Sequence, residues 1–191
     1  MVATTGYAPA VRAGPYAIAA SQARYMVERG DWQGAAALKV GPSRFSYVDA
    51  ITYFARALGA ARSGNADAAT ADIAKLAELR NKLQQDKDAY WAEIVDIQWQ
   101  VATAWQLNAQ GKQAEALEAM RLAADAEDKT EKSIVTPGPL APARELYGTM
   151  LLERGWQRRH WPPSKAPCAR SRTALARRSA PLTPPRRRTT P

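Results

Sequence analysis

Histidine and cysteine are almost absent from the sequence, which has one of each among its 191 residues, His160 and Cys168. One cysteine permits no internal disulfide, and this pair matches no spacing of zinc ligands. The two residues lie eight positions apart in a proline-rich stretch, which offers no scaffold to hold a nucleophile against a base. The sequence therefore predicts no catalytic residue and no metal site, and the scattered carboxylates are expected on solvated helix faces.

The sequence also lacks a glycine-rich phosphate loop and a long apolar run. Its glycines are isolated, so no nucleotide or other cofactor is predicted. No stretch reaches about 18 uncharged apolar residues, so no membrane span is expected. Residues 1–15 contain two glycines and two prolines and lack the pattern of a secretory signal. The chain as it stands is expected in the cytoplasm, although a longer parent protein could be exported.

Acidic residues are missing from the end of the chain. Residues 156–191 contain ten Lys and Arg, no Asp or Glu, and seven of the 13 prolines. Residues 1–155 contain 17 Lys and Arg against 18 Asp and Glu, a net charge of −1, so the formal charge of +9 comes from the tail. The run Arg186–Arg188 would attract phosphates, but no aromatic stacking platform accompanies it. Nucleic acid is therefore not favoured as a partner.

Four glycines mark an internal repeat, because each follows a helical run and has a small residue seven positions earlier. The glycines and their small residues are Gly30 with Ala23, Gly64 with Ala57, Gly111 with Ala104, and Gly155 with Gly148. The first three glycines are followed at plus five by an alanine, which is Ala35, Ala69 or Ala116. This spacing predicts helical hairpins, in which a left-handed glycine ends the first helix and small residues let the two helices approach closely.

The interval from Gly30 to Gly64 is 34 residues, and the stretches ARYMVERGDWQGAAAL, ARALGAARSGNADAATADI and ATAWQLNAQGKQAEALEAM resemble tetratricopeptide repeats. The stretches DAYWAEIVDIQWQVATAW and EDKTEKSIVTPGPLAPARELYGTMLLERG resemble, more narrowly, the C-terminal repeat region of larger bacterial tetratricopeptide proteins of unassigned function. The resemblance implies an all-α solenoid of helical hairpins that binds protein and brings no catalytic residues. The chain would then be an internal piece of a longer protein.

We expect three regions: a flexible N-terminal segment at 1–14, a repeat domain at 15–155, and a disordered basic tail at 156–191. Seven helices are predicted near 15–29, 32–40, 46–63, 66–85, 88–110, 112–126 and 140–154, with a loop from Asp128 to Pro142. In the longest helix, Tyr90, Ile94, Ile97, Val101, Ala104 and Leu107 form one apolar stripe. Trp91 and Trp99 share another face and either pack on the preceding helix or line a groove.

The function predicted from these features is a non-catalytic scaffold that holds a protein or peptide ligand on the first helices of its hairpins. Candidate partner-binding residues, chosen by helix and polarity, are Arg24, Tyr53, Arg56, Glu93, Trp99 and Gln100. Two alternatives remain open at this point. The chain could be the C-terminal regulatory part of a larger enzyme or export-associated protein, or a truncated fragment whose uncapped ends drive non-native self-association.

We hypothesise that residues 156–191 are out of frame, because the last hairpin has a first helix and a turn glycine but no second helix. Moving the frame two nucleotides on forces an alanine from Trp156–Gln157 and a leucine–alanine pair from His160–Trp161–Pro162, whatever codons are used. We expect the nucleotide sequence across codons 150 to 191 to encode a repeat-like helix in a shifted frame. A nucleotide sequence without such a helix in either other frame would contradict the hypothesis.

Overall fold

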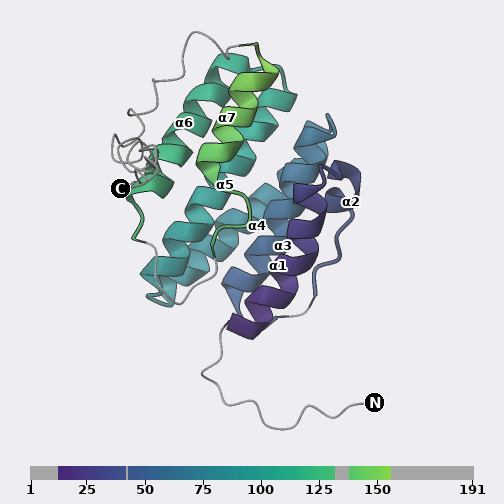
Figure 1. Cartoon of the computed structure of the whole chain (residues 1–191). Helices are drawn as coiled ribbons and strands as arrows, with labels where there is room; N and C mark the ends of the chain where they lie inside the picture. Colours follow the sequence, from purple (N-terminus) through teal and green to yellow (C-terminus); the bar gives the residue numbers. More distant parts are fainter. Residues whose placement is uncertain (1–12, 42, 132–137, 156–191) are drawn as a thin grey trace, which may run out of the picture. The chain divides into compact units, whose positions relative to one another are not determined.

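The computed structural model describes residues 13–41, 43–131 and 138–155 (Figure 1). These residues form seven α-helices and no strand, so the prediction of an all-α fold is confirmed. The helices are α1 (Ala13–Glu28), α2 (Trp32–Ala36), α3 (Ser46–Arg62), α4 (Ala66–Gln85), α5 (Ala89–Ala109), α6 (Gln113–Lys129) and α7 (Ala143–Glu153). They all lie in one compact unit that ends at Arg154. The predicted tail at 156–191 and most of the predicted N-terminal segment lie outside the described residues.

Each helix packs against its neighbours in sequence, and α3 packs in addition on α1 and α5. Figure 1 shows α1 beside α3, and α7 lying against α5 and α6. Helix α5 is central, because it contacts α3, α4, α6 and α7. A second buried stripe of α5, which was not predicted, contains Trp91, Val95, Gln98, Ala102 and Trp105. A helix enclosed by four others buries more than one face.

The predicted left-handed conformation is confirmed at all four marker glycines, three of which lie between consecutive described helices. Their φ angles are +68° at Gly30, +81° at Gly64, +78° at Gly111 and +68° at Gly155. At the end of α3, the N–H of Gly64 donates to the carbonyl of Ala61 at 3.1 Å, and the N–H of Asn65 donates to that of Ala60 at 3.0 Å. This pair of hydrogen bonds satisfies carbonyls that the helix end leaves without partners.

The turn between α4 and α5 closes in the same way without a glycine. Lys87 has a φ of +58°, and its N–H donates to the carbonyl of Gln84 at 3.1 Å. The N–H of Asp88 donates to the carbonyl of Leu83 at 2.9 Å. A lysine carries no signal for left-handed backbone, which explains why the sequence marked only the glycine closures.

Small residues allow the close helix contacts that the repeat predicted. Ala23, Ala57, Ala104, Ala35, Ala69 and Ala116 are each at most 1% exposed. The closest approach involves Gly59 of α3, where an added Cβ would lie 2.5 Å from the Trp32 carbonyl oxygen and 2.6 Å from the Ala36 nitrogen. Helices α2 and α3 therefore meet almost backbone to backbone, and no side chain fits between them.

Four helix ends differ from the prediction by two or more residues. Helix α2 stops at Ala36 rather than residue 40, because the following chain runs along α3, where Arg56 Nη1 donates to the Leu38 carbonyl at 2.9 Å. Helix α7 begins at Ala143 rather than residue 140, because Pro142 holds its N-cap in an extended conformation. Helix α6 continues to Lys129, past the predicted start of the loop, and α1 begins at Ala13, within the predicted flexible segment.

Candidate polypeptide-binding channel

A groove of about 580 Å³ separates α1 from α7, and we call it the channel. Its walls come from α1, from the turn before α2, from the end of α3, from the segment before α7 and from α7 itself. The lining residues are Arg24, Val27, Glu28, Arg29, Gly30, Trp32, Arg62, Pro139, Leu140, Ala141, Pro142, Glu145, Leu146 and Thr149. Apolar side chains and arginines thus share the lining with two glutamates.

Residues 138–142, which we call the strap, are non-helical and lie along the channel. The Tyr16 hydroxyl donates to the Gly138 carbonyl at 3.4 Å, and Arg24 Nη2 donates to the Pro139 carbonyl at 3.2 Å. Burial raises the pKa of the Tyr16 phenol, an effect that the nearby Arg24 opposes. The phenol therefore keeps its proton at neutral pH and remains a donor. Two helix side chains thus recognise the strap through its backbone.

The strap is also fixed by one apolar side chain. Leu140 is only 5% exposed and belongs to the main core. With its two neighbours it lines a small cavity that also includes Phe54 of α3 and Ile97 and Val101 of α5. The faces of α1, α3 and α5 therefore hold a non-helical segment of polypeptide that belongs to the chain itself.

Arg62, at the end of α3, lines the channel. Its guanidinium group lies between two tryptophan rings. Its guanidinium carbon lies 4.2 Å from the ring centroid of Trp32 and 4.1 Å from that of Trp105. Nη2 is paired with Oε1 of Glu153 on α7 at 2.5 Å, whereas Nη1 is buried without a hydrogen-bond partner. Leaving a buried donor unsatisfied costs about 1–3 kcal/mol, which cation–π contacts of about 0.5–2 kcal/mol each can offset.

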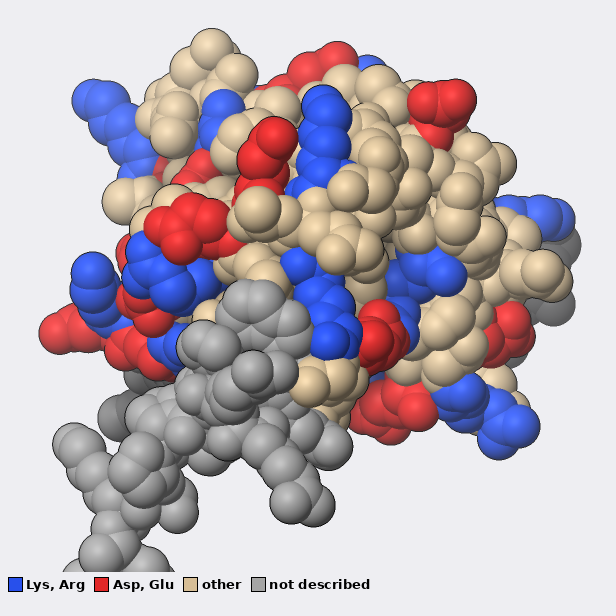
Figure 2. Space-filling model, turned by 90° about the horizontal axis from the view of Figure 1, so that it is seen from above, with Lys and Arg blue, Asp and Glu red and all other residues tan. Residues whose placement is uncertain are grey.

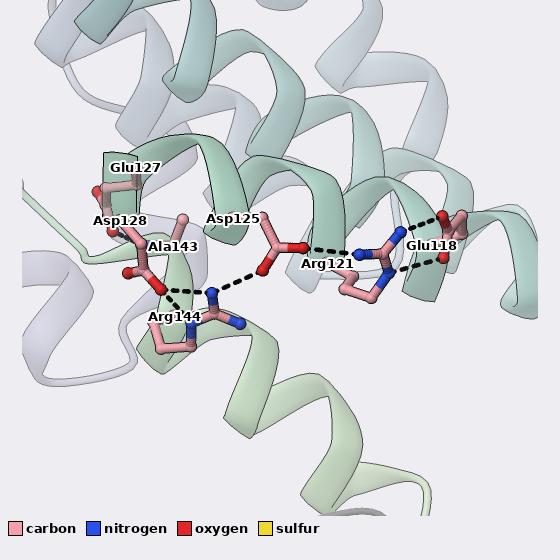
Figure 3. A network of polar contacts seen from close by, with 7 residues as sticks. All are labelled: Glu118, Arg121, Asp125, Glu127, Asp128, Ala143 and Arg144. Carbon is pink, nitrogen blue, oxygen red and sulfur yellow. Dashed lines mark hydrogen bonds and ion pairs between the residues drawn. The ribbon is translucent and has the colours of Figure 1, made fainter. Parts of the chain in front are cut away.

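Helix α7 has no capping side chain of its own, and α6 supplies one (Figure 3). The backbone N–H of Ala143 donates to the buried carboxylate of Glu127 at 2.7 Å. Beside it, Arg144 donates to Asp125 at 2.8 Å and to Asp128 at 2.5 Å. The hydrogen bond from Arg144 lowers the pKa of Asp125 below its ordinary range. This network fixes the start of α7, and with it the end of the strap and one wall of the channel.

The network continues along the surface of α6. Arg121 donates to Asp125 on one side and to Glu118 on the other, both at 2.6 Å (Figure 3). These exposed pairs lie one helical turn apart within a single helix, so they add little to the attachment of α7.

Of the six residues predicted to bind a partner, Arg24 is the one that lines the channel. Two others, Arg56 and Gln100, make polar contacts near α4, directly with that helix or through another side chain. Arg56 Nε is paired with Asp72 of α4 at 3.1 Å. Gln100 donates to Asp96 at 2.6 Å, and that carboxylate in turn is paired with Arg80 of α4 at 2.8 Å. These side chains are engaged within the fold.

The other three predicted residues are also separated from the channel. The guanidinium carbon of Arg80 lies over the Trp99 ring, 5.0 Å from the ring centroid. Trp99 therefore packs on the preceding helix α4, which was one of the two predicted alternatives. Tyr53 is half-buried against the core. Glu93 accepts a hydrogen bond from the Thr130 hydroxyl at 2.7 Å, beside the end of α6. The structure does not bring the six residues together into one site.

Trp91, predicted to share a face with Trp99, has different neighbours from that residue. Trp91 stacks on Tyr47 of α3, with ring centroids 4.1 Å apart and planes 12° apart, and lies 5.5 Å from the ring of Tyr16 on α1. Trp91 helps to position Tyr16, which holds the strap.

Sequence analysis missed the strap and Arg62. A signal for the strap was present, because the run Gly138–Pro142 is rich in proline and cannot be helical, yet it contains a leucine that needs burial. No comparable signal marked Arg62, whose neighbours Trp32 and Trp105 come from different hairpins. Only the packing of α2 against α3 and of α3 against α5 brings the three side chains together.

The described part of the chain contains no group of three or more His, Cys, Asp or Glu side chains placed to hold a metal ion. None of its helices combines the length and the apolar character needed to cross a membrane. On the face seen in Figure 2, Lys and Arg side chains are interspersed with Asp and Glu among larger uncharged areas. Comparisons with protein-family models, curated proteins and solved structures gave no match.

We predict that Glu127→Ala lowers the free energy of unfolding by about 1.5–3 kcal/mol, because it removes a charged partner from a buried backbone N–H. Urea unfolding followed by circular dichroism measures this change. The matched control is Glu118→Ala, which removes an exposed carboxylate from the same helix and should change stability little. Equal losses in the two variants would show that Glu127 does not anchor α7.

Proposed function

We propose that this protein is a non-catalytic scaffold of tetratricopeptide-like hairpins that binds an extended segment of another polypeptide in the channel. The observation that carries the proposal is the strap. Tyr16 and Arg24 donate to two successive backbone carbonyls, and Leu140 enters an apolar site between α3 and α5. The helix faces beside the channel thus already hold a non-helical segment of polypeptide through two backbone carbonyls and one buried leucine.

The channel lies next to the strap and has similar chemistry. Its volume of about 580 Å³ is within the range of about 300–1,000 Å³ that is typical of ligand sites. Val27 and Leu146 contribute apolar surface from opposite walls. Arg29 and Glu145 provide charges of both signs for polar contacts with a ligand. Such a lining suits a peptide of mixed composition that is held by shape and scattered hydrogen bonds.

The repeat interpretation supports the same proposal. Three hairpin closures with left-handed glycines are followed by buried alanines at plus five, and first helices α1, α3 and α5 pack in sequence. Stacks of this kind present the surfaces of their first helices to a ligand, so that many side chains meet a single bound segment. The channel lies between α1, the first of those helices, and α7.

We predict that Thr149→Trp, which fills the channel from the wall of α7, weakens peptide binding by at least about tenfold, because the indole occupies the volume the ligand needs. The ligands are peptides selected from a displayed random library against the unmodified full chain. Fluorescence anisotropy with the labelled peptides measures their affinity.

The matched control is Ala74→Trp, which places the same side chain on the exposed face of α4. It should leave the affinity unchanged. The proposal would be wrong if the selection gave no peptide that binds, or if the selected peptides bound the Thr149→Trp and Ala74→Trp variants equally well.

A further inference from the structure

Gln98, on the central helix α5, places a polar oxygen in the core. The residue is 7% exposed, and its Oε1 is buried and accepts no hydrogen bond from the described part of the protein. Buried polar atoms of folded proteins are nearly always paired, either with a protein group or with an ordered water. The amide oxygen of Gln98 therefore calls for a donor that the described residues do not supply.

The same side chain lines the small cavity beside Leu140 of the strap, which we call the Gln98 cavity. Its volume is about 20 Å³. A site needs about 10–15 Å³ of such space to hold one water molecule. The Gln98 cavity thus has room for one water and is too small for a larger ligand.

Glu127 of α6 brings a second acceptor to this cavity. It is 8% exposed, and its Oε2 already accepts the N–H of Ala143 at 2.7 Å. A carboxylate has about four acceptor positions, so this hydrogen bond leaves capacity for a further donor. The other side chains of the described lining, such as Phe54, Ile97 and Leu140, are hydrocarbons. The cavity therefore combines two oxygen acceptors with an otherwise apolar wall.

We propose that the Gln98 cavity binds one water molecule, which donates one hydrogen to Oε1 of Gln98 and the other to the carboxylate of Glu127. The two O–H groups of a water match the two acceptors, and a buried water requires about two to four polar partners. An apolar guest would leave both acceptors unpaired, and an anion would be repelled by the carboxylate. The water joins α5 to the residue of α6 that caps α7, beside the buried leucine of the strap.

Binding of this water does not depend on peptide binding in the channel. Nuclear Overhauser effects between water and the methyl groups of the full chain test it directly. The methyl groups of Val101 and Leu140 line the cavity and should show cross-peaks at the water frequency, with the sign of a water that stays bound. Those of Leu76, which is fully buried in α4 and does not line the cavity, should show none. Absence of the cross-peaks at Val101 and Leu140 would overturn the proposal.

The variant Gln98→Leu removes one acceptor and keeps a similar side-chain volume. A single acceptor is fewer than the two partners that a buried water needs, so the cross-peaks at Val101 and Leu140 should disappear. The matched control, Gln84→Leu, makes the same substitution at an exposed position of α4 and should leave the cross-peaks unchanged. Circular dichroism should show the helical content of the unmodified chain in both variants. Cross-peaks that persist in Gln98→Leu would show that Gln98 does not hold the water, and would overturn the proposal.

A crystal structure of the unmodified chain gives a second result, which decides the matter even where Gln98→Leu does not fold. It should show one water whose oxygen lies about 2.5–3.0 Å from Oε1 of Gln98 and from a carboxylate oxygen of Glu127. A dry cavity would overturn the proposal. So would a rotated Gln98 whose oxygen accepts from a protein group, because that acceptor would then need no water.

Discussion

Close approach of helices at alanine and glycine positions is the constraint on which the rest of the structure depends. Gly59 lets α3 meet the backbone of α2, and alanines such as Ala57 and Ala69 are fully buried between the helices of a hairpin. Left-handed residues at the ends of the first helices then reverse the chain, so that the next helix can pack at this short distance. Because the helices lie so close together, large side chains are directed to the remaining spaces, where Trp91, Trp105 and Phe54 form the core.

That packing also creates the channel. Trp91 fixes Tyr16 and Trp105 supports Arg62, so residues of the central helix position groups on α1 and α3. The strap then crosses faces that the helices leave uncovered, and Glu127 fastens its far end by capping α7. The strap is thus held by hydrogen bonds to two of its own backbone carbonyls, by burial of its leucine, and by the capped helix that follows it. The same types of contact are available to a foreign segment in the channel.

Much of the fold could be predicted from the sequence, because local signals determine it. The glycines at 30, 64 and 111 and the alanines five residues later predicted the hairpins, and most helix bounds agreed to within one residue, the largest differences being at the end of α2, the end of α6 and the start of α7. The site could be predicted only in part. Arg24 was identified, whereas Arg56 and Gln100 are engaged beside α4 and lie away from the channel. Helix membership and polarity do not reveal which face a side chain occupies, and the partners of Arg62 come from separate hairpins.

Nuclear magnetic resonance of the methyl-labelled full chain, titrated with a selected peptide, tests the central claim that the channel holds extended polypeptide. Val27 and Leu146 line the channel from opposite walls, whereas Ile73 and Leu79 belong to α4. If the channel binds the peptide, the methyl signals of Val27 and Leu146 should shift together with peptide concentration, while those of Ile73 and Leu79 should stay in place. Shifts confined to α4, with the channel signals unchanged, would contradict it.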